Sequence, residues 1–233
     1  KIVKTNTIKI AEFSKLLENI YRAVNIGFIN EMKFVADKMG IDIFDIIKIA
    51  STKPYGFRPF NPGPGIGGHC IPIDPHYLYW KAKKSGISAN FIKLSAETNS
   101  KVINFINKKV FRIISDLKIK KDKTKILILG LAYKKNMDDI RESASIKLAE
   151  TLKNDNFKHL SYCDPHIKNQ ISTKKYNYLQ KINKLYPSII KKFDIVILMT
   201  DHDIFNYNMI KKNSKKIIDC RGRYQIDNKV VRG

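Results

Sequence analysis

Four short runs rich in isoleucine, leucine and valine recur through the second half of the chain. They cover residues 125–131, 159–163, 194–200 and 216–220, and helical or polar segments separate them. Alternation of this kind favours a doubly wound parallel sheet. Ligands of such sheets bind beyond the carboxyl ends of the strands. At those ends this chain carries Lys134, Asp164, Thr200, Asp201, His202 and Arg221.

The first half of the chain has helical periodicity instead. Apolar residues recur at helical spacing from Ala11 to Met39, and Gly40 provides a stop. A shorter helix is predicted after Asp42, and an amphipathic stretch over residues 102–117 predicts another long one. This half is therefore expected to be mainly helical.

A charged stretch at residues 118–125 holds a single apolar residue and is predicted to be a solvated linker. We therefore expect an α/β protein of two parts. Residues 1–118 would form an all-helical domain, and residues 119–233 a Rossmann-like domain with a parallel sheet.

The formal net charge of +23 raises the question of a nucleic-acid partner. Lysines are scattered through nearly every segment, and the sequence has no zinc-finger spacing, basic leucine zipper or aromatic RNA-binding signature. We interpret the charge as compositional bias that also helps to attract an anionic substrate. No nucleic-acid partner and no bound metal are expected.

The cysteines and the apolar runs bear on where the protein works. Cys70, Cys163 and Cys220 are odd in number and far apart, which argues against a secreted disulfide scaffold and favours a reducing compartment. The longest apolar runs are far below the roughly 20 residues that span a bilayer. No signal peptide is visible, so we expect a cytoplasmic protein without a membrane partner. The chain begins at Lys1 without a methionine, and an amino-terminal portion is expected to be absent.

One cysteine lies between a glycine-rich loop and a predicted helix start. The run from Gly63 to Pro75 has Cys70 near its middle, and Asp74 followed by Pro75 has the order of a helix N-cap and first helical position. The alternatives are a small buried cysteine and a plain cap. The glycines match G-x-G-x-x-G, but no apolar strand precedes them, so we expect the loop to serve a substrate, not a nicotinamide cofactor.

Three segments together resemble the UDP-glucose/GDP-mannose dehydrogenase family. They are residues 11–26, 63–75 and 130–143, in the order found in that family. The resemblance covers nearly the whole chain, and the sequence of residues 67–75 looks most like that of the UDP-N-acetylhexosamine dehydrogenase branch. It implies a helical central domain that dimerises and a UDP-binding domain, and a role in polysaccharide biosynthesis.

The resemblance also implies a reaction, in which a sugar C6 alcohol is oxidised to a carboxylate with two NAD+. Cys70 would capture the intermediate aldehyde as a thiohemiacetal, which is oxidised to a thioester that water cleaves. By matching position, Lys15 and Asn19 would supply donors to the oxyanion, and residues four apart do share a helix face. Asp74 would assist proton transfer or position the water. The alternative for Lys15 is a solvated helix lysine.

The predicted substrate contacts lie in both halves of the chain. Lys134 and Arg221 offer the donors that a diphosphate requires, although lysines are abundant in this chain and Arg223 competes with Arg221 for the alignment. By resemblance, Tyr133 joins them on the surface that binds uridine diphosphate. Arg58 corresponds to an arginine that one subunit of a dimer contributes to the site of the other. Phe60 and Gly67 complete the predicted substrate-binding set.

The amino-terminal NAD-binding domain of the family has no counterpart in this sequence. Neither its dinucleotide fingerprint nor its acidic catalytic residue is present, so the cofactor contacts stay unassigned and the chain is expected to be a fragment, inactive by itself. The expected partners are a UDP-sugar and a second copy of the chain. Two alternatives stay open: a UDP-glucose 6-dehydrogenase, and a truncated non-catalytic module for sugar-nucleotide binding or dimerisation.

Overall fold

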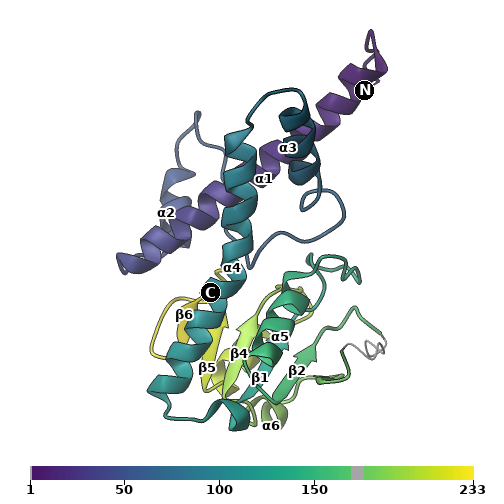
Figure 1. Cartoon of the computed structure of the whole chain (residues 1–233). Helices are drawn as coiled ribbons and strands as arrows, with labels where there is room; N and C mark the ends of the chain where they lie inside the picture. Colours follow the sequence, from purple (N-terminus) through teal and green to yellow (C-terminus); the bar gives the residue numbers. More distant parts are fainter. Residues whose placement is uncertain (1, 169–175) are drawn as a thin grey trace.

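The computed structural model describes residues 2–168 and 176–233, and it begins with a group of helices (Figure 1). The long helix predicted over residues 11–39 is confirmed but starts earlier, because the Thr7 side chain caps it by accepting a hydrogen bond from the Ile10 N–H. Asp42 caps the next helix as predicted, accepting from the Phe44 N–H at 3.1 Å. The helices are α1 (Ile8–Lys38), α2 (Ile43–Ala50), α3 (Asp74–Lys84) and α4 (Asn90–Asp116).

The second half forms the predicted doubly wound parallel sheet, in the order β3-β2-β1-β4-β5-β6. Its strands are β1 (Lys125–Leu129), β2 (His159–Cys163), β3 (Leu179–Lys181), β4 (Ile195–Leu198), β5 (Lys216–Asp219) and β6 (Val230–Arg232). All four predicted apolar runs became strands. The edge strands β3 and β6 were not predicted, because three residues each are too few to show a pattern.

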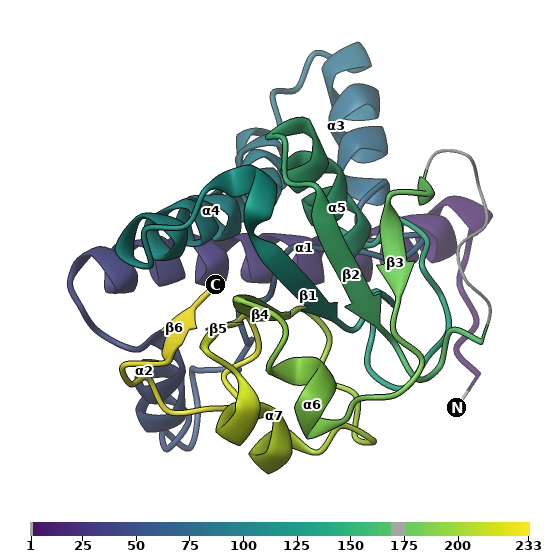
Figure 2. The same ribbon diagram turned by 90° about the horizontal axis from the view of Figure 1, so that it is seen from below.

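Helices cover both faces of this sheet (Figure 2). Alternate residues of β1 point to opposite faces, so Ile126 and Ile128 join one apolar core and Leu127 and Leu129 the other. The first core is closed by α4 and α5 (Ala144–Asn154). The second is closed by α6 (Pro187–Ile190) and α7 (Tyr207–Asn213).

Helix α4 belongs to both halves of the molecule. Near its amino end, Asn99 donates to the Ala23 carbonyl oxygen of α1 at 3.2 Å. Farther along, Val102, Ile106 and Val110 are completely buried in the core beneath the sheet. The helix therefore connects the other helices of that half to one face of the sheet (Figure 1).

The order of the strands reverses between β1 and β4, so the loops that follow these two strands lie side by side. Gly130, which follows β1, has a φ of +79°, and a Cβ built there would approach the Thr200 Cβ to 2.5 Å. Only glycine fits this combination of left-handed backbone and close approach. The Thr200 hydroxyl then donates to the Ala132 carbonyl oxygen at 2.6 Å and ties the two loops together.

Across residues 2–168 and 176–233, we find no helix with the length and apolar character needed to cross a membrane.

Candidate active site

Cys70 starts the tight turn that leads into α3. Its carbonyl oxygen accepts hydrogen bonds from the N–H groups of Ile73, at 3.0 Å, and Asp74, at 2.8 Å. Its side chain is exposed, with Sγ 3.9 Å from the Nδ1 of His69. Burial raises the pKa of both Cys163 and Cys220 to about 12, which keeps these two as unreactive thiols. Cys70 is therefore the cysteine that a small substrate can reach.

Asn19 and Asp74 are joined directly. The buried Asn19 amide donates from Nδ2 to Asp74 Oδ2 at 2.6 Å, and its Oδ1 accepts from Arg22. The prediction that Asp74 is the N-cap of α3 was wrong: Ile73 holds the cap position, and Asp74 is the first helical residue. The reason is tertiary, because the Asp74 carboxylate faces α1 and is taken up by Asn19. Cys70 lies on the same turn as Asp74, so the backbones of the two residues are adjacent.

Lys15 lies one turn before Asn19 on α1, as the spacing predicts. Its Nζ is 3.5 Å from Glu18 Oε2, and 64% of its side chain is exposed. In this state Lys15 is a solvated helix lysine, as the alternative interpretation had it. Its part in catalysis stays a prediction.

The cysteine loop packs on the loop that follows β1. The Gly68 N–H donates to the Arg141 carbonyl oxygen at 3.0 Å. A Cβ at Gly67 would come within 2.5 Å of the Tyr133 Cβ, so a larger residue at this position would push the loops apart. Two segments predicted separately, one with the thiol and one with Tyr133 and Lys134, are therefore in contact.

A cationic group that the sequence did not single out also lies near the thiol. Arg141 binds Asp139 through two nitrogens, at 3.0 and 2.7 Å, and the guanidinium is within electrostatic reach of Cys70.

Arg221 lies where the helical half and the sheet meet. Its backbone N–H donates to Asp219 Oδ1 at 2.9 Å, and its Nε donates to the Met199 carbonyl oxygen at 2.6 Å. One of its terminal nitrogens would be 3.4 Å from a Cβ at Gly63, at the start of the cysteine loop. Arg223 is paired with Asp201 at 2.8 Å, and the Nε of Arg221 is 3.9 Å from the same carboxylate. Of these two arginines, Arg221 is the one that borders the cysteine loop. Lys134, the other predicted diphosphate contact, is exposed on the loop after β1.

A buried hydrogen-bond network shapes the loop that carries Tyr133 and Lys134. Asp164 Oδ2 accepts from the N–H groups of Leu131 and Ala132, at 2.7 and 2.9 Å, and lies 3.0 Å from His202 Nε2. The Nδ1 of His202 accepts from the Asn136 N–H at 3.0 Å, so the proton of a neutral His202 lies on Nε2 and is donated to Asp164. Both ends of the loop are thereby held.

Phe60 and Arg58 line a hollow that is separate from the cysteine loop. Phe60 is half-buried and packs edge-on against Tyr21 with ring centroids 5.7 Å apart. Arg58 is exposed and lines a hollow of about 470 Å³ together with Phe28 and Phe60. The structure therefore does not bring these two predicted substrate contacts to Cys70 within this chain.

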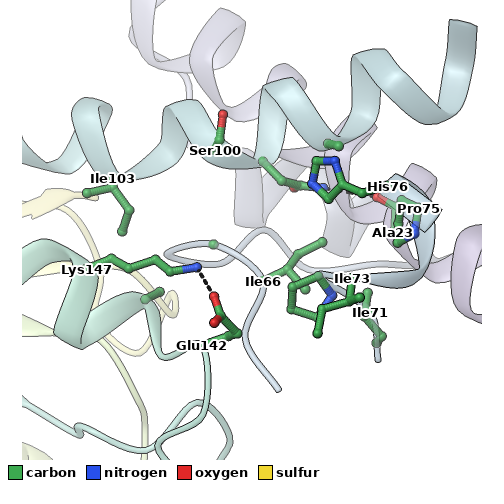
Figure 3. A pocket seen from close by; sticks show the side chains of 15 residues that line it. Ala23, Ile66, Ile71, Ile73, Pro75, His76, Ser100, Ile103, Glu142 and Lys147 are labelled. Carbon is green, nitrogen blue, oxygen red and sulfur yellow. Dashed lines mark hydrogen bonds and ion pairs between the residues drawn. The ribbon is translucent and has the colours of Figure 1, made fainter. Parts of the chain in front are cut away.

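A cavity of about 380 Å³ lies behind the cysteine loop (Figure 3). Ile66 and Ile71 of the loop form one side, and Ser100 and Ile103 of α4 form another. The ion pair between Glu142 and Lys147 also borders this space. Because the loop is not packed solidly from behind, its position depends on polar anchors at its ends.

Lys33 supplies one of these anchors, which the sequence pattern did not indicate. The side chain is almost completely buried, and its Nζ donates to the carbonyl oxygens of Gly63, at 3.2 Å, and Gly233, at 2.8 Å. Asn30, one turn earlier on α1, accepts from the Gly63 N–H at 3.1 Å. Burial lowers the pKa of Lys33 to about 8. A lysine in an amphipathic helix pattern is ordinarily exposed, which is why its spacing carried no signal.

Comparisons with known proteins identify relatives of this chain. The UDP-glucose/GDP-mannose dehydrogenase family matches with its central domain over residues 9–101 and its UDP-binding domain over residues 127–226. A UDP-N-acetyl-D-mannosamine dehydrogenase of Methanococcus vannielii is 35% identical over 204 residues, which are 88% of this chain and 43% of that protein. An NDP-N-acetyl-D-galactosaminuronic acid dehydrogenase of Ralstonia nicotianae is 32% identical, over 92% of this chain and 48% of its own.

A solved structure of a relative also matches the fold of this chain. The UDP-D-ManNAc dehydrogenase of Pyrococcus horikoshii has a TM-score of 0.78 and 30% identity, over 94% of this chain and 49% of the other. The chain thus spans about half the length of the relatives it matches. It belongs to the UDP-glucose/GDP-mannose dehydrogenase family, of which it carries the central and UDP-binding domains.

Proposed function

We propose that this chain is the cysteine-bearing and UDP-binding part of an NAD-dependent UDP-N-acetylhexosamine 6-dehydrogenase. The observation that carries the proposal is the packing of the loop with Cys70 on the loop with Tyr133 and Lys134. In this proposal, the thiol and the diphosphate-binding edge serve one elongated ligand. The names of the relatives favour an N-acetylated hexosamine over glucose.

Each part of the site has a chemical task in this proposal. Lys134 and Arg221 hold the diphosphate, Lys134 as a point charge and Arg221 with a planar fork. The Cys70 sulfur adds to the C6 aldehyde and forms a thiohemiacetal. Asn19 donates one amide hydrogen to Asp74 and keeps a second for the developing oxyanion, which Lys15 also faces after leaving Glu18.

The thiohemiacetal then loses the C6 hydride and its hydroxyl proton and becomes a thioester. The final step is hydrolysis. Water adds to the thioester carbon, the sulfur leaves as thiolate and the product is the uronate. We assign to Asp74 the role of orienting this water, since its second carboxylate oxygen is not the one that binds Asn19.

The two oxidations need a hydride acceptor, which the family resemblance identifies as NAD+. The glycine-rich loop of this chain does not fit this cofactor. The glycines at residues 63–68 follow no strand, and the Gly68 N–H is already bound to Arg141. We therefore place no NAD contact in this chain.

We also propose a homodimer. Large apolar side chains stay exposed along α1, and such surface is typical of an interface. They are Phe13, Leu17, Tyr21, Phe28 and Val35.

Calorimetry with UDP tests the binding part of the proposal. We expect the chain to bind UDP, and Lys134→Met or Arg221→Met to weaken binding at least about tenfold, because each removes a charged contact to phosphate. Lys135→Met is the matched control, since Lys135 lies on the same loop but pairs with Asp203 at 2.5 Å. NAD+ should not bind. Absence of UDP binding, or tight NAD+ binding, contradicts the proposal.

A further inference from the structure

The start of α2 is hydrogen-bonded to the edge strand β6 of the sheet, through the helix-capping residue Asp42. Arg232, the last residue of β6, donates from Nε to both carboxylate oxygens of Asp42, at 3.0 and 3.1 Å, and from a terminal nitrogen at 2.5 Å. The other terminal nitrogen donates to Asp219 Oδ2 at 2.7 Å. The arginine is 7% exposed, Asp219 is fully buried, and β6 lies next to α2 in Figure 2.

Asp219 in turn shapes the turn that presents Arg221. Its Oδ1 accepts from the Arg221 N–H and its Oδ2 accepts from the Tyr224 N–H, both at 2.9 Å. Phe44 of α2 packs on the same turn, because a Cβ at Gly222 would come within 2.5 Å of its ring. A continuous path therefore runs from Asp42 through Arg232 and Asp219 to the backbone of Arg221.

The adjoining residue makes a parallel connection. Gly233 donates its N–H to the Asp219 carbonyl oxygen at 3.1 Å, while its own carbonyl oxygen accepts from Lys33. Lys33 also holds Gly63, which borders the Arg221 guanidinium. The strand end at residues 232–233 is thus tied to the helical half at two points.

Stability does not explain this arrangement. Burial raises the pKa of Asp219, against the hydrogen bonds from Tyr224 and Arg221 and the charge of Arg232. A buried ion pair is commonly no more stabilising than apolar residues of the same size, and its attested use is to fix geometry.

We propose that Arg232 is a positioning residue, which sets the affinity for the diphosphate of a nucleotide sugar by holding Arg221 beside the cysteine loop. The inference rests on the proposed function, because it takes Arg221 as a diphosphate ligand. Arg232 itself does not touch the ligand and acts through Asp219 and the Arg221 backbone.

A double-mutant cycle with UDP as the probe tests this. We expect Arg232→Met to weaken UDP binding about tenfold, the coupling typical of residues in one network. In the Arg221→Met background the same substitution should change UDP binding little, because its effect passes through Arg221. A merely structural role would instead give equal losses in both backgrounds.

Two further variants separate positioning from general damage. Asp42→Asn keeps the shape of the network and should also weaken UDP binding, which supports the proposal even where Arg232→Met folds poorly. Lys109→Met removes the pair with Asp37 at 2.5 Å, which lies within the helical half, and should leave UDP affinity unchanged. Wild-type UDP affinity in Arg232→Met and Asp42→Asn, or additive losses in the cycle, would overturn the role of Arg232. If the wild-type chain does not bind UDP, the proposed function itself fails.

Discussion

Replacing Cys70 by serine should abolish uronate formation, with a loss of at least about 10⁴-fold in kcat, the scale on which removal of a nucleophile acts. The reason is that a serine hydroxyl is far less ionised than a thiol at neutral pH and is a poorer leaving group from the acyl intermediate. Cys70 is exposed, whereas Cys163 and Cys220 are buried. NADH release with a UDP-N-acetylhexosamine and NAD+ measures the effect.

The assay needs the part of the relatives that this chain does not cover, so the variant is made in a fusion to the amino-terminal half of the Pyrococcus horikoshii relative. Cys163→Ala is the matched control, because that thiol is buried and its pKa is raised to about 12. It should leave turnover near the wild-type level. Undiminished uronate formation by the Cys70→Ser fusion would remove Cys70 from the reaction.

Replacing Asp164 by alanine should cost about 3–5 kcal/mol of the free energy of unfolding, because it leaves buried donors without an acceptor. They are the N–H groups of Leu131, Ala132 and His166 and the Nε2 of His202. Urea unfolding measures the loss. Asp203→Ala is the control on a neighbouring loop: its side chain is 65% exposed and paired with Lys135, so its loss should be far smaller than that of Asp164→Ala.

The same network predicts an acid dependence. Burial opposes ionisation of Asp164, but hydrogen bonds from His202, Ala132 and His166 outweigh it and lower its pKa to about 2. An unfolded aspartate has a pKa of about 3.9, so this group contributes about 2–3 kcal/mol that is complete above pH 4 and lost as the pH falls through 2. Asp164→Asn should flatten this part of the stability profile relative to the wild type. An unchanged profile would show that Asp164 is not stabilised in its ionised form.

The sequence predicted what depends on local patterns. The parallel sheet followed from buried runs such as Ile195–Leu198, whose side chains are apolar on both faces of the sheet. The long helix followed from its period, and the contact between the cysteine loop and the loop after β1 fits the two segments picked out separately. The placement of strand ends at one edge followed from the topology.

What the sequence did not predict depends on contacts between distant residues. Asp74 was expected to cap its helix, but Asn19 lies 55 positions away and competes for its carboxylate. Arg232 and Asp42 are 190 positions apart. The strand that carries Arg232 has only three residues, and no sequence pattern connects it to the start of α2. Lys33 looks like any other lysine of this chain until the fold closes over it.

The most direct test of the account asks whether the thiol and the diphosphate surface serve one ligand. Alkylation of Cys70 by iodoacetamide, followed by mass spectrometry of the 233-residue chain, measures access to the sulfur. We predict that the 6-aldehyde of a UDP-N-acetylhexosamine slows alkylation at least about tenfold by forming the thiohemiacetal, and that Arg221→Met weakens this protection. Alkylation of Cys70 at an unchanged rate while calorimetry shows the nucleotide bound would contradict a shared site.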